Sequence, residues 1–306
     1  MNPSSHPENL KILFGPYGSV LPSLGLNSDV QKICRSGQQD WYSLAIEMIA
    51  RGYHDAGATM PTVNAFFLRT ALKEGFTELF KNMLSLNLQA LLKALKLKTK
   101  EKLTICLGPA GDCYSPQEAP DEKAAYEFHK YQYSLCLEVM NRFGLSTKDV
   151  LFLHETIGTQ REAVGLSLAA HSLSIPLIVS FVVTRKGYLL SGELIEPTIE
   201  KIDSLTHHFV QGFSLNCCSP YAFDAVVKTF RNPKQIKRII GFYPNSYDSD
   251  PCFYESGATL FEPKKEETIK LILEKGHSNH LGFVGGCCGF NYHDVKLLCQ
   301  LKGCSL

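Results

Sequence analysis

Two pairs of adjacent cysteines are the residues of this chain best suited to metal chemistry. They are Cys217 with Cys218 and Cys287 with Cys288, and each pair follows a short apolar segment. A catalytic zinc site in a protein has three protein ligands and one open position in a tetrahedron. One cysteine of the first pair and both of the second would supply three thiolates. The spacing leaves Cys217 and Cys218 as alternatives, and buried thiols without a metal are the competing interpretation.

The second pair lies in a glycine-rich run that gives the backbone unusual freedom. Adjacent residues of a regular strand point to opposite faces, so Cys287 and Cys288 can share an ion only where the chain leaves strand geometry. Gly285, Gly286 and Gly289 supply that freedom, because glycine adopts backbone angles closed to other residues. This glycine context favours a metal site over two cysteine pairs that adjoin by chance.

Eight short apolar segments alternate with helical patterns along the 306 residues. Several are apolar almost throughout, which is typical of parallel strands covered on both faces. Eight strands, each followed by a helix, predict an α/β protein, a single-domain (β/α)8 TIM barrel over residues 1–306. A doubly wound sheet is the alternative, but the glycine-rich phosphate turn that it normally carries does not occur in the sequence. The predicted strands are 11–15, 58–63, 103–109, 150–156, 176–183, 212–218, 238–245 and 281–288.

In such barrels the chemistry lies at the carboxyl ends of the strands. Four of the predicted strands end in polar or cysteine-rich residues, so we expect these to converge on one rim. They are His154, Glu155 and Thr156, then Asn216 with the first cysteine pair, then Tyr243 and Asn245, and finally the run 285–289.

Two local patterns predict how elements join. Thr159 and Glu162 have the spacing of a capping box, in which the threonine oxygen accepts from the glutamate amide and the carboxylate reaches back to the threonine amide. The segment 186–192 predicts an inserted turn or hairpin after the fifth strand.

Composition excludes several classes of function. The 31 basic and 30 acidic residues give a net charge of +1, without the basic excess of a nucleic-acid or membrane-surface protein. Residues 1–15 lack a signal-peptide pattern, and the longest apolar run, 175–183, is too short to span a bilayer. We therefore expect a cytoplasmic protein whose other cysteines are thiols, among them Cys106, Cys136 and Cys299 in apolar stretches.

At these residues the sequence resembles the homocysteine S-methyltransferase family. The specific signature is Asn216 and Cys217, followed by the Gly-Gly-Cys-Cys-Gly run at 285–289. Weaker matches are the stretch 54–58, the Glu-Thr-Ile at 155–157 and the Tyr-Pro-Asn at 243–245, which resembles members that use S-methylmethionine. The resemblance spans most of the chain.

The resemblance implies zinc-dependent transfer of a methyl group from a sulfonium donor, S-methylmethionine or S-adenosylmethionine, to the thiolate of homocysteine, giving methionine. Cys217, Cys287 and Cys288 would hold Zn²⁺, and the homocysteine sulfur would take the fourth position. Glu155 would bind the amino group of homocysteine and be the principal catalytic-site carboxylate. Further substrate contacts are expected at Gly15, Thr62, Thr156, Asn216, Tyr243 and Asn245.

One position departs from the family pattern. Phe14 stands where the family usually has an aspartate close to the substrate, and Thr62 or Asn64 are candidates to compensate. This departure motivates a second hypothesis, a divergent member that acts on another thiol or a selenol. A third is a non-catalytic barrel that binds zinc or thiols.

Overall fold

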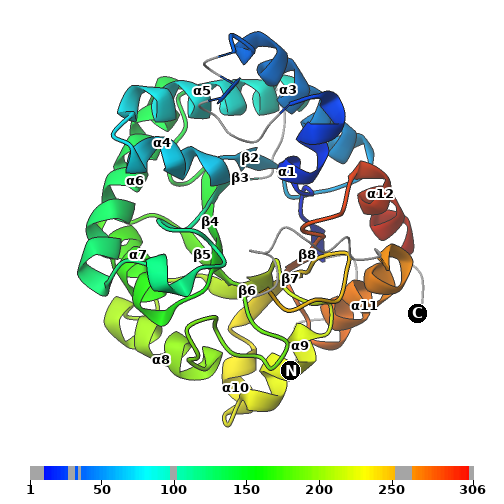
Figure 1. Ribbon diagram of the computed structural model, residues 1–306. Helices are drawn as coiled ribbons and strands as arrows, with labels where there is room; N and C mark the ends of the chain where they lie inside the picture. Colours follow the sequence, from blue (N-terminus) through cyan, green and yellow to red (C-terminus); the bar gives the residue numbers. More distant parts are fainter. Residues whose placement is uncertain (1–9, 27–31, 34–35, 97–101, 252–263, 303–306) are drawn as a thin grey trace.

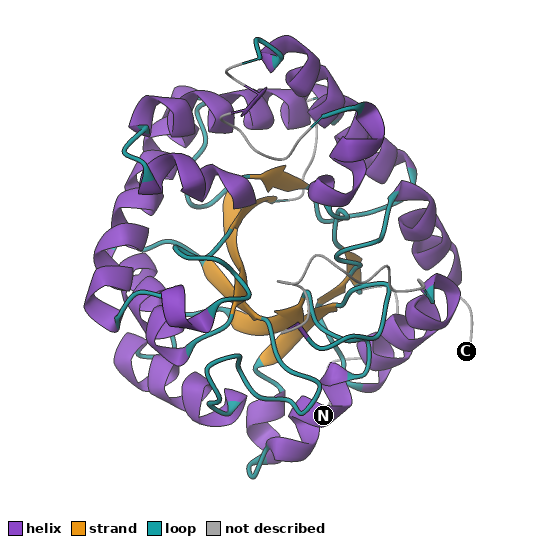
Figure 2. Ribbon diagram, in the orientation of Figure 1, coloured by secondary structure: helices purple, strands orange, loops and turns teal. Residues whose placement is uncertain are grey.

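The computed structural model describes residues 10–26, 32–33, 36–96, 102–251 and 264–302. Its eight strands form a ring that is enclosed by helices (Figures 1 and 2). The predicted α/β fold, a (β/α)8 barrel, is confirmed. The strands are β1 (Lys11–Ile12), β2 (Thr62–Asn64), β3 (Leu103–Leu107), β4 (Val150–Ile157), β5 (Leu177–Phe181), β6 (Gly212–Asn216), β7 (Ile239–Tyr243) and β8 (Phe283–Val284).

The helices lie between successive strands and cover the outside of the ring (Figure 2). The α-helices are α1 (Tyr17–Val20), α3 (Gln39–Asp55), α4 (Arg69–Lys73), α5 (Thr77–Ala94), α6 (Glu122–Arg142), α7 (Gln160–Ser172), α8 (Ile195–Thr206), α9 (Ala222–Thr229), α10 (Pro233–Ile236), α11 (Lys265–Ser278) and α12 (Tyr292–Leu301). The described part of the chain also contains the short 3-10 helices η2 (Leu21–Leu24), η3 (Phe66–Leu68) and η4 (Pro116–Glu118).

All strand pairs in the ring are parallel, in the order β1-β8-β7-β6-β5-β4-β3-β2. The gap between β1 and β2 is closed by a parallel bridge between Leu13 and Met60. There the amide of Phe14 donates to the Met60 carbonyl at 3.1 Å, and the amide of Met60 donates to the Ile12 carbonyl at 2.9 Å. The ring is therefore a closed barrel.

The last strand is shorter than predicted. β8 ends at Val284, whereas the sequence predicts a strand over 281–288. The chain turns away because the Cys287 amide donates to the Pro244 carbonyl beyond the end of β7, at 2.7 Å. The second cysteine pair therefore lies in a loop and not in a strand.

The inside of the barrel is filled by inward side chains from seven of the strands and their ends. Gly241 on β7 leaves room for the Phe283 ring in this layer. A larger apolar cluster packs the outer strand faces against the helices. Because the interior is filled, a ligand must bind above it, at the rim. The interior residues are Leu13, Met60, Cys106, Leu153, Ile178, Tyr243 and Phe283.

Only half of the predicted capping box forms. The Thr159 side chain accepts from the Glu162 amide at 3.4 Å, as expected. The Glu162 carboxylate instead accepts from the Ala110 amide at 2.6 Å and contacts His129 Nε2 at 3.0 Å. Glu162 is 2% exposed, so its carboxylate needs buried hydrogen-bond partners. It finds them at Ala110 and His129 and does not return to the Thr159 amide.

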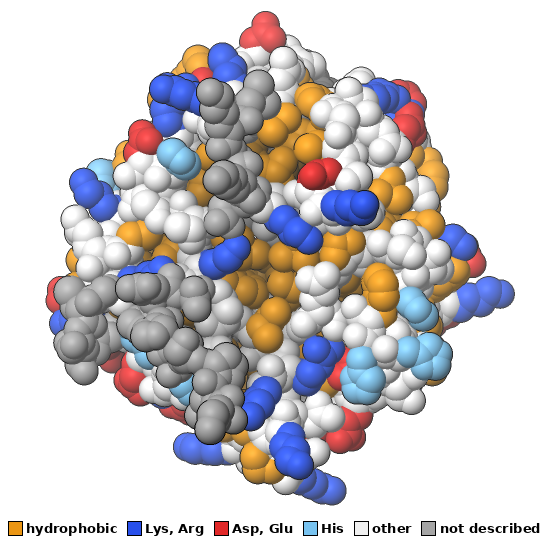
Figure 3. Space-filling view, turned by 180° about the vertical axis from the view of Figure 1, so that it is seen from behind, with side chains coloured by type: hydrophobic (Ala, Val, Ile, Leu, Met, Phe, Trp, Pro, Cys, Tyr) orange, Lys and Arg blue, Asp and Glu red, His pale blue; other side chains and the backbone are white. Residues whose placement is uncertain are grey.

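The predicted insertion after β5 is a small antiparallel turn, with bridges from Val183 to Leu189 and from Tyr188 to Leu194. Arg185 pairs with Asp248 in the loop after β7 at 2.6 Å, which fixes the turn against that loop. The face turned away from Figure 1 shows apolar side chains near its middle with Lys and Arg side chains around them (Figure 3). Among the described residues, no helix has the length and apolarity needed to cross a membrane.

The close contact between α6 and α7 yields a stability prediction. A Cβ at Gly165 would lie 2.5 Å from the Glu122 carbonyl oxygen and 2.6 Å from the Ala125 Cβ. Gly165→Ala should therefore lower the free energy of unfolding by about 1–3 kcal/mol through overpacking. Thermal unfolding followed by circular dichroism measures the effect.

Gly52→Ala in α3 is the matched control. Its Cβ would meet Tyr292 only at 3.4 Å, an ordinary contact, and alanine is the better helix former. We expect this variant to be neutral or slightly stabilising. Equal melting temperatures for the two variants would contradict the packing argument.

Candidate active site

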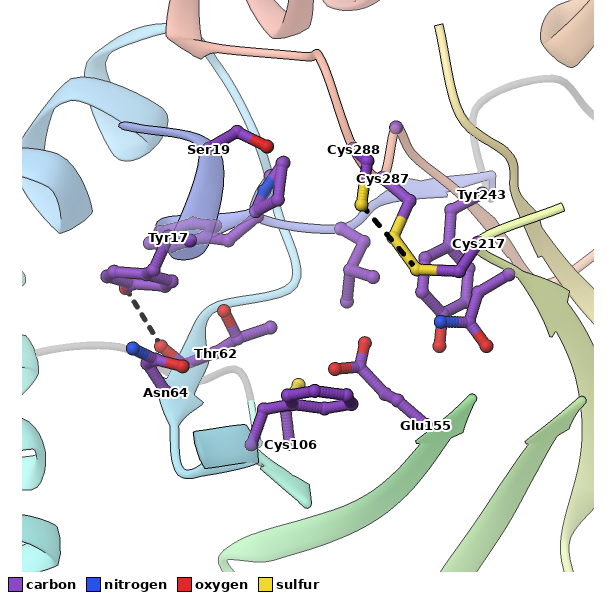
Figure 4. A pocket seen from close by; sticks show the side chains of 18 of the residues that line it. Tyr17, Ser19, Thr62, Asn64, Cys106, Glu155, Cys217, Tyr243, Cys287 and Cys288 are labelled. Atoms are coloured by element: carbon purple, nitrogen blue, oxygen red, sulfur yellow. Dashed lines mark hydrogen bonds between the residues drawn. A yellow bond between two sulfur atoms is a disulfide. The ribbon is translucent and has the colours of Figure 1, made fainter. Parts of the chain in front are cut away.

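A cavity of about 250 Å³ opens at the carboxyl ends of the strands, above the filled interior. Figure 4 shows its arrangement: the cysteines of the loops after β6 and β8 lie on one side, Glu155 and Cys106 lie across from them, and Tyr17, Thr62 and Asn64 line the far wall. Six of the predicted substrate contacts line this cavity. They are Gly15, Thr62, Glu155, Thr156, Asn216 and Tyr243.

The sulfur atoms of Cys217, Cys287 and Cys288 all lie within 4.8 Å of one another. The structure thus places Cys217 with the second pair, whereas Cys218 is fully buried in the outer apolar cluster. Of the alternatives that spacing left open, Cys217 is the one that faces the other two sulfurs. Three sulfurs this close form a donor set for one soft metal ion.

Two of these sulfurs are bonded to each other. Cys217 and Cys287 form a disulfide with a Cα–Cα distance of 5.6 Å, and Cys288 Sγ lies 4.0 Å from Cys217 Sγ (Figure 4). The prediction that all three cysteines bind a metal as thiolates concerns the reduced form and stays a prediction. Metal binding by all three requires the reduced form.

The loop after β7 holds the cysteine loops in place. Asn245 is fully buried; its side chain accepts from the Cys288 amide at 3.0 Å, and its own amide donates to the Cys218 carbonyl at 3.0 Å. The Ser246 amide donates to the Cys288 carbonyl at 2.9 Å. Asn245, a predicted substrate contact, does not line the cavity but connects the two cysteine loops behind it.

Asn216 positions the residue that follows Glu155. Its Oδ1 accepts from the Thr156 amide at 2.9 Å and from Ser180 Oγ at 2.7 Å, and its Nδ2 donates to Thr156 Oγ1 at 2.8 Å. Thr156 has φ of 61° and Cys217 has φ of 49°, values that β-branched and other non-glycine residues seldom adopt. Such strain persists where surrounding contacts impose it. The Asn216 amide therefore acts mainly within the protein, coupling Glu155 to Cys217.

An irregularity in β4 aims Glu155 into the cavity. The register between β4 and β5 shifts between His154 and Ile157, and a bulge of this kind redirects a side chain. Burial raises the pKa of the Glu155 carboxyl to about 7, and the nearby Tyr243 hydroxyl and Cys106 thiol oppose this only in part. The carboxyl is thus poised between its neutral and charged forms near neutral pH.

Two neighbours of Glu155 complete the polar floor of the cavity. The Tyr243 hydroxyl is buried and makes no hydrogen bond of normal geometry with the described residues. Cys106 also lines the cavity, although the sequence analysis interpreted it as an ordinary core thiol. Its place near the carboxyl end of the third strand was the signal that it faces the site. Burial raises the pKa of this thiol well above its usual value.

The third cysteine has two tyrosine neighbours that the sequence analysis did not single out as its partners. Burial raises the pKa of the Cys288 thiol, and hydrogen bonds with the hydroxyls of Tyr114 and Tyr247 oppose that rise. Tyr114 follows β3 and Tyr247 follows β7, so loops from two sides of the barrel reach this sulfur. Neither position belongs to a recognisable motif.

The far wall of the cavity is aromatic. Phe14, Tyr17, Phe66 and Phe67 line it, and the Tyr17 hydroxyl donates to the Thr62 carbonyl at 3.0 Å. The residue that departs from the family pattern, Phe14, is 3% exposed and therefore forms part of this wall.

Comparisons with known proteins identify the family and the fold of the chain. The profile of the homocysteine S-methyltransferase family matches residues 14–301, and the chain belongs to this family. Among curated proteins, no sequence matches the chain significantly.

Solved structures of the homocysteine methyltransferase MmuM from Escherichia coli share the fold. The oxidised form has a TM-score of 0.72 at 15% sequence identity and covers 95% of each chain. The metallated form has a TM-score of 0.71 at 16% identity, with 95% of this chain and 96% of that chain covered. The apo form has a TM-score of 0.62 at 15% identity, with 96% of each chain covered.

The raised pKa of Glu155 predicts a pH-dependent effect of its removal. A carboxyl with a pKa of about 7 in the folded protein, against 4.5 ordinarily, contributes stability that is complete at low pH and is lost as the pH rises through about 7. Near pH 8, Glu155→Gln should therefore raise the melting temperature of the reduced, metal-free protein. The rise should be about 2–4 °C for each kcal/mol of charge-burial cost that the substitution removes. Near pH 5 it should change little.

Glu118→Gln, which neutralises an exposed carboxyl, is the control and should leave the melting temperature nearly unchanged at both pH values. If Glu155→Gln had the same effect near pH 5 and near pH 8, burial would not be the origin of the shift.

Proposed function

We propose that this protein is a zinc-dependent homocysteine S-methyltransferase. It would transfer a methyl group from a sulfonium donor, S-methylmethionine or S-adenosylmethionine, to the sulfur of homocysteine, giving methionine. The observation that carries the proposal is the set of three sulfurs, of Cys217, Cys287 and Cys288, within 4.8 Å of one another beside a cavity that also contains Glu155. Membership of the family supports homocysteine as the acceptor.

The donor set fits zinc. Thiolates are preferred zinc ligands, and three of them leave one position for a further sulfur. When bound, zinc would keep the acceptor thiol deprotonated and nucleophilic. Zinc binding by all three thiolates requires the Cys217–Cys287 disulfide to be reduced, so the proposal includes a reducing compartment such as the cytoplasm.

The other residues of the cavity bind and orient the acceptor. The Glu155 carboxylate is suited to the ammonium group of homocysteine, and the buried Tyr243 hydroxyl beside it can join that contact. The aromatic wall packs against the methylene groups and excludes water. Holding sulfur and methyl in line replaces a bimolecular encounter by a positioned one, which is a major source of rate enhancement.

Phe14 favours a second candidate, a related enzyme that accepts another thiol or a selenol. The family aspartate would supply an acidic contact that Phe14 cannot make, and Phe14 is buried in the cavity wall. Substrates that need two acidic contacts are therefore disfavoured.

Removal of one cysteine tests the metal site. Reduced protein should bind about one zinc ion per chain, and Cys287→Ala should lose most of it, because two thiolates rarely hold zinc alone. Metal content after gel filtration, by mass spectrometry, measures this. Cys218→Ala is the matched control, since this neighbour is buried in the apolar cluster and should leave zinc bound. Full zinc retention by Cys287→Ala would contradict the proposal that Cys287 is a zinc ligand.

Turnover tests the reaction itself. Reduced, zinc-loaded protein should form methionine from homocysteine with S-methylmethionine or S-adenosylmethionine, detected by mass spectrometry. Cys287→Ala should reduce the rate to background, because the acceptor thiol then stays protonated at neutral pH. Absence of methionine with these donors and with betaine would favour the non-catalytic zinc- or thiol-binding barrel.

A further inference from the structure

Helix α3 carries apolar side chains on two of its sides. It lies on the outside of the barrel, between α5 and α12 (Figure 1). Its inward side, which includes Ile46 and Ile49, is buried in the core. On the outward side Trp41 is 39% exposed, Leu44 is 46% exposed and Met48 is 48% exposed. The core of the barrel therefore accounts for only one of the two apolar sides.

The exposed residues of α3 form one continuous stripe. Trp41, Leu44 and Met48 follow one another at intervals of three and four residues, and Arg51 continues the row at the next interval. Ten residues of helix span about 15 Å. Single exposed apolar residues are ordinary on a protein surface, whereas a contiguous patch is typical of an interaction site. We call these four residues the α3 stripe.

Both ends of the α3 stripe are held in place within the chain. The indole nitrogen of Trp41 donates to the Leu24 carbonyl at 3.2 Å. The guanidinium of Arg51 pairs with Glu47 at 2.7 Å, and Glu47 also pairs with Lys93 of α5 at 2.7 Å. Because these contacts order the ring and the guanidinium in advance, little side-chain freedom remains to be lost when a partner binds.

The α3 stripe is complementary to itself in the antiparallel orientation. A two-fold axis between Leu44 and Met48 would place Leu44 against the partner's Met48 and Trp41 against the partner's Arg51. Apolar side chains then meet each other, and each guanidinium meets an indole ring, which attracts a cation. A parallel copy would bring the two arginines together, and their like charges repel. A contact between identical surfaces requires this kind of two-fold complementarity.

We propose that the α3 stripe is the interface of a symmetric dimer of this chain, with α3 packed antiparallel against α3 of the second copy. Intervals of three and four residues are those of helices that pack at a small crossing angle. Four side chains from each copy make a small interface, so the dimer is reversible, with a Kd of about 1–100 µM. No residue of the α3 stripe lines the cavity, so the dimer does not depend on the proposed reaction.

Self-association and the environment of Trp41 can be measured on the same samples. Trp41 is the one tryptophan of the chain, so its emission reports on this surface alone. Sedimentation of the reduced full-length chain from about 1 to 300 µM should show a change from monomer to dimer around the expected Kd. The tryptophan emission should shift over the same range, because the partner removes water from the ring. A monomer at every concentration, or a dimer without an emission shift, overturns the proposal.

A matched pair of variants locates the interface. Leu44→Glu should raise the Kd at least about tenfold, because the dimer would bury an unpaired carboxylate. Leu205→Glu makes the same change at a residue of α8 that is 42% exposed, and it should leave the Kd unchanged. Circular dichroism verifies that both variants fold. Equal effects of the two substitutions, or no effect of Leu44→Glu, would overturn the proposal.

A mixture of two variants tests the antiparallel orientation. Leu44→Glu and Met48→Lys should each weaken self-association. Mixed in equal amounts, they should associate at least about tenfold more tightly than either alone, because the antiparallel pair brings the new carboxylate beside the new ammonium and leaves one apolar contact intact. A mixture that associates no better than its components overturns the proposed orientation.

Discussion

The site depends on one constraint, the convergence of sulfurs from two loops that are far apart in the sequence. Asn245 holds the two loops together. Its backbone amide donates to the Cys218 carbonyl, and its side-chain oxygen accepts from the Cys288 amide. The Cys287 amide is bonded to Pro244 in the same segment. Cysteines separated by 70 residues in the sequence thereby come together at one site. The remainder of the barrel gives this arrangement a floor and a wall.

A second coupling links the sulfur site to the carboxyl that faces it. Asn216 directly precedes Cys217 and holds the strained Thr156 beside Glu155. The Asn216 amide at the end of β6 thus fixes the sulfur site relative to the Glu155 carboxyl of β4, across the intervening strand β5. This rigidity suits a reaction in which positioning matters more than proton transfer.

Much of this was predictable, and the failures have physical causes. The eight strands and the barrel follow from alternation of apolar segments with helical patterns, and the glycines around Cys287 predict a departure from strand geometry. The role of Asn245 was not predictable, because a side chain that bonds a distant backbone amide has no periodic signal. Cys106 is the buried free thiol that the sequence predicts, but its second place in the cavity lining was not predictable, because one cysteine on an apolar strand has the same pattern whether or not it also borders a cavity. The Glu162 half of the capping box failed because buried groups of Ala110 and His129 competed for its carboxylate.

The central claim is that three cysteines of this chain hold one zinc ion and leave a position for a substrate sulfur. X-ray absorption at the zinc edge tests it most directly, using reduced, zinc-loaded protein. The account predicts three sulfur scatterers at about 2.3 Å, rising to four when the acceptor thiol is added. A zinc shell with fewer than three sulfurs, or one that does not change on addition of the thiol, would contradict it.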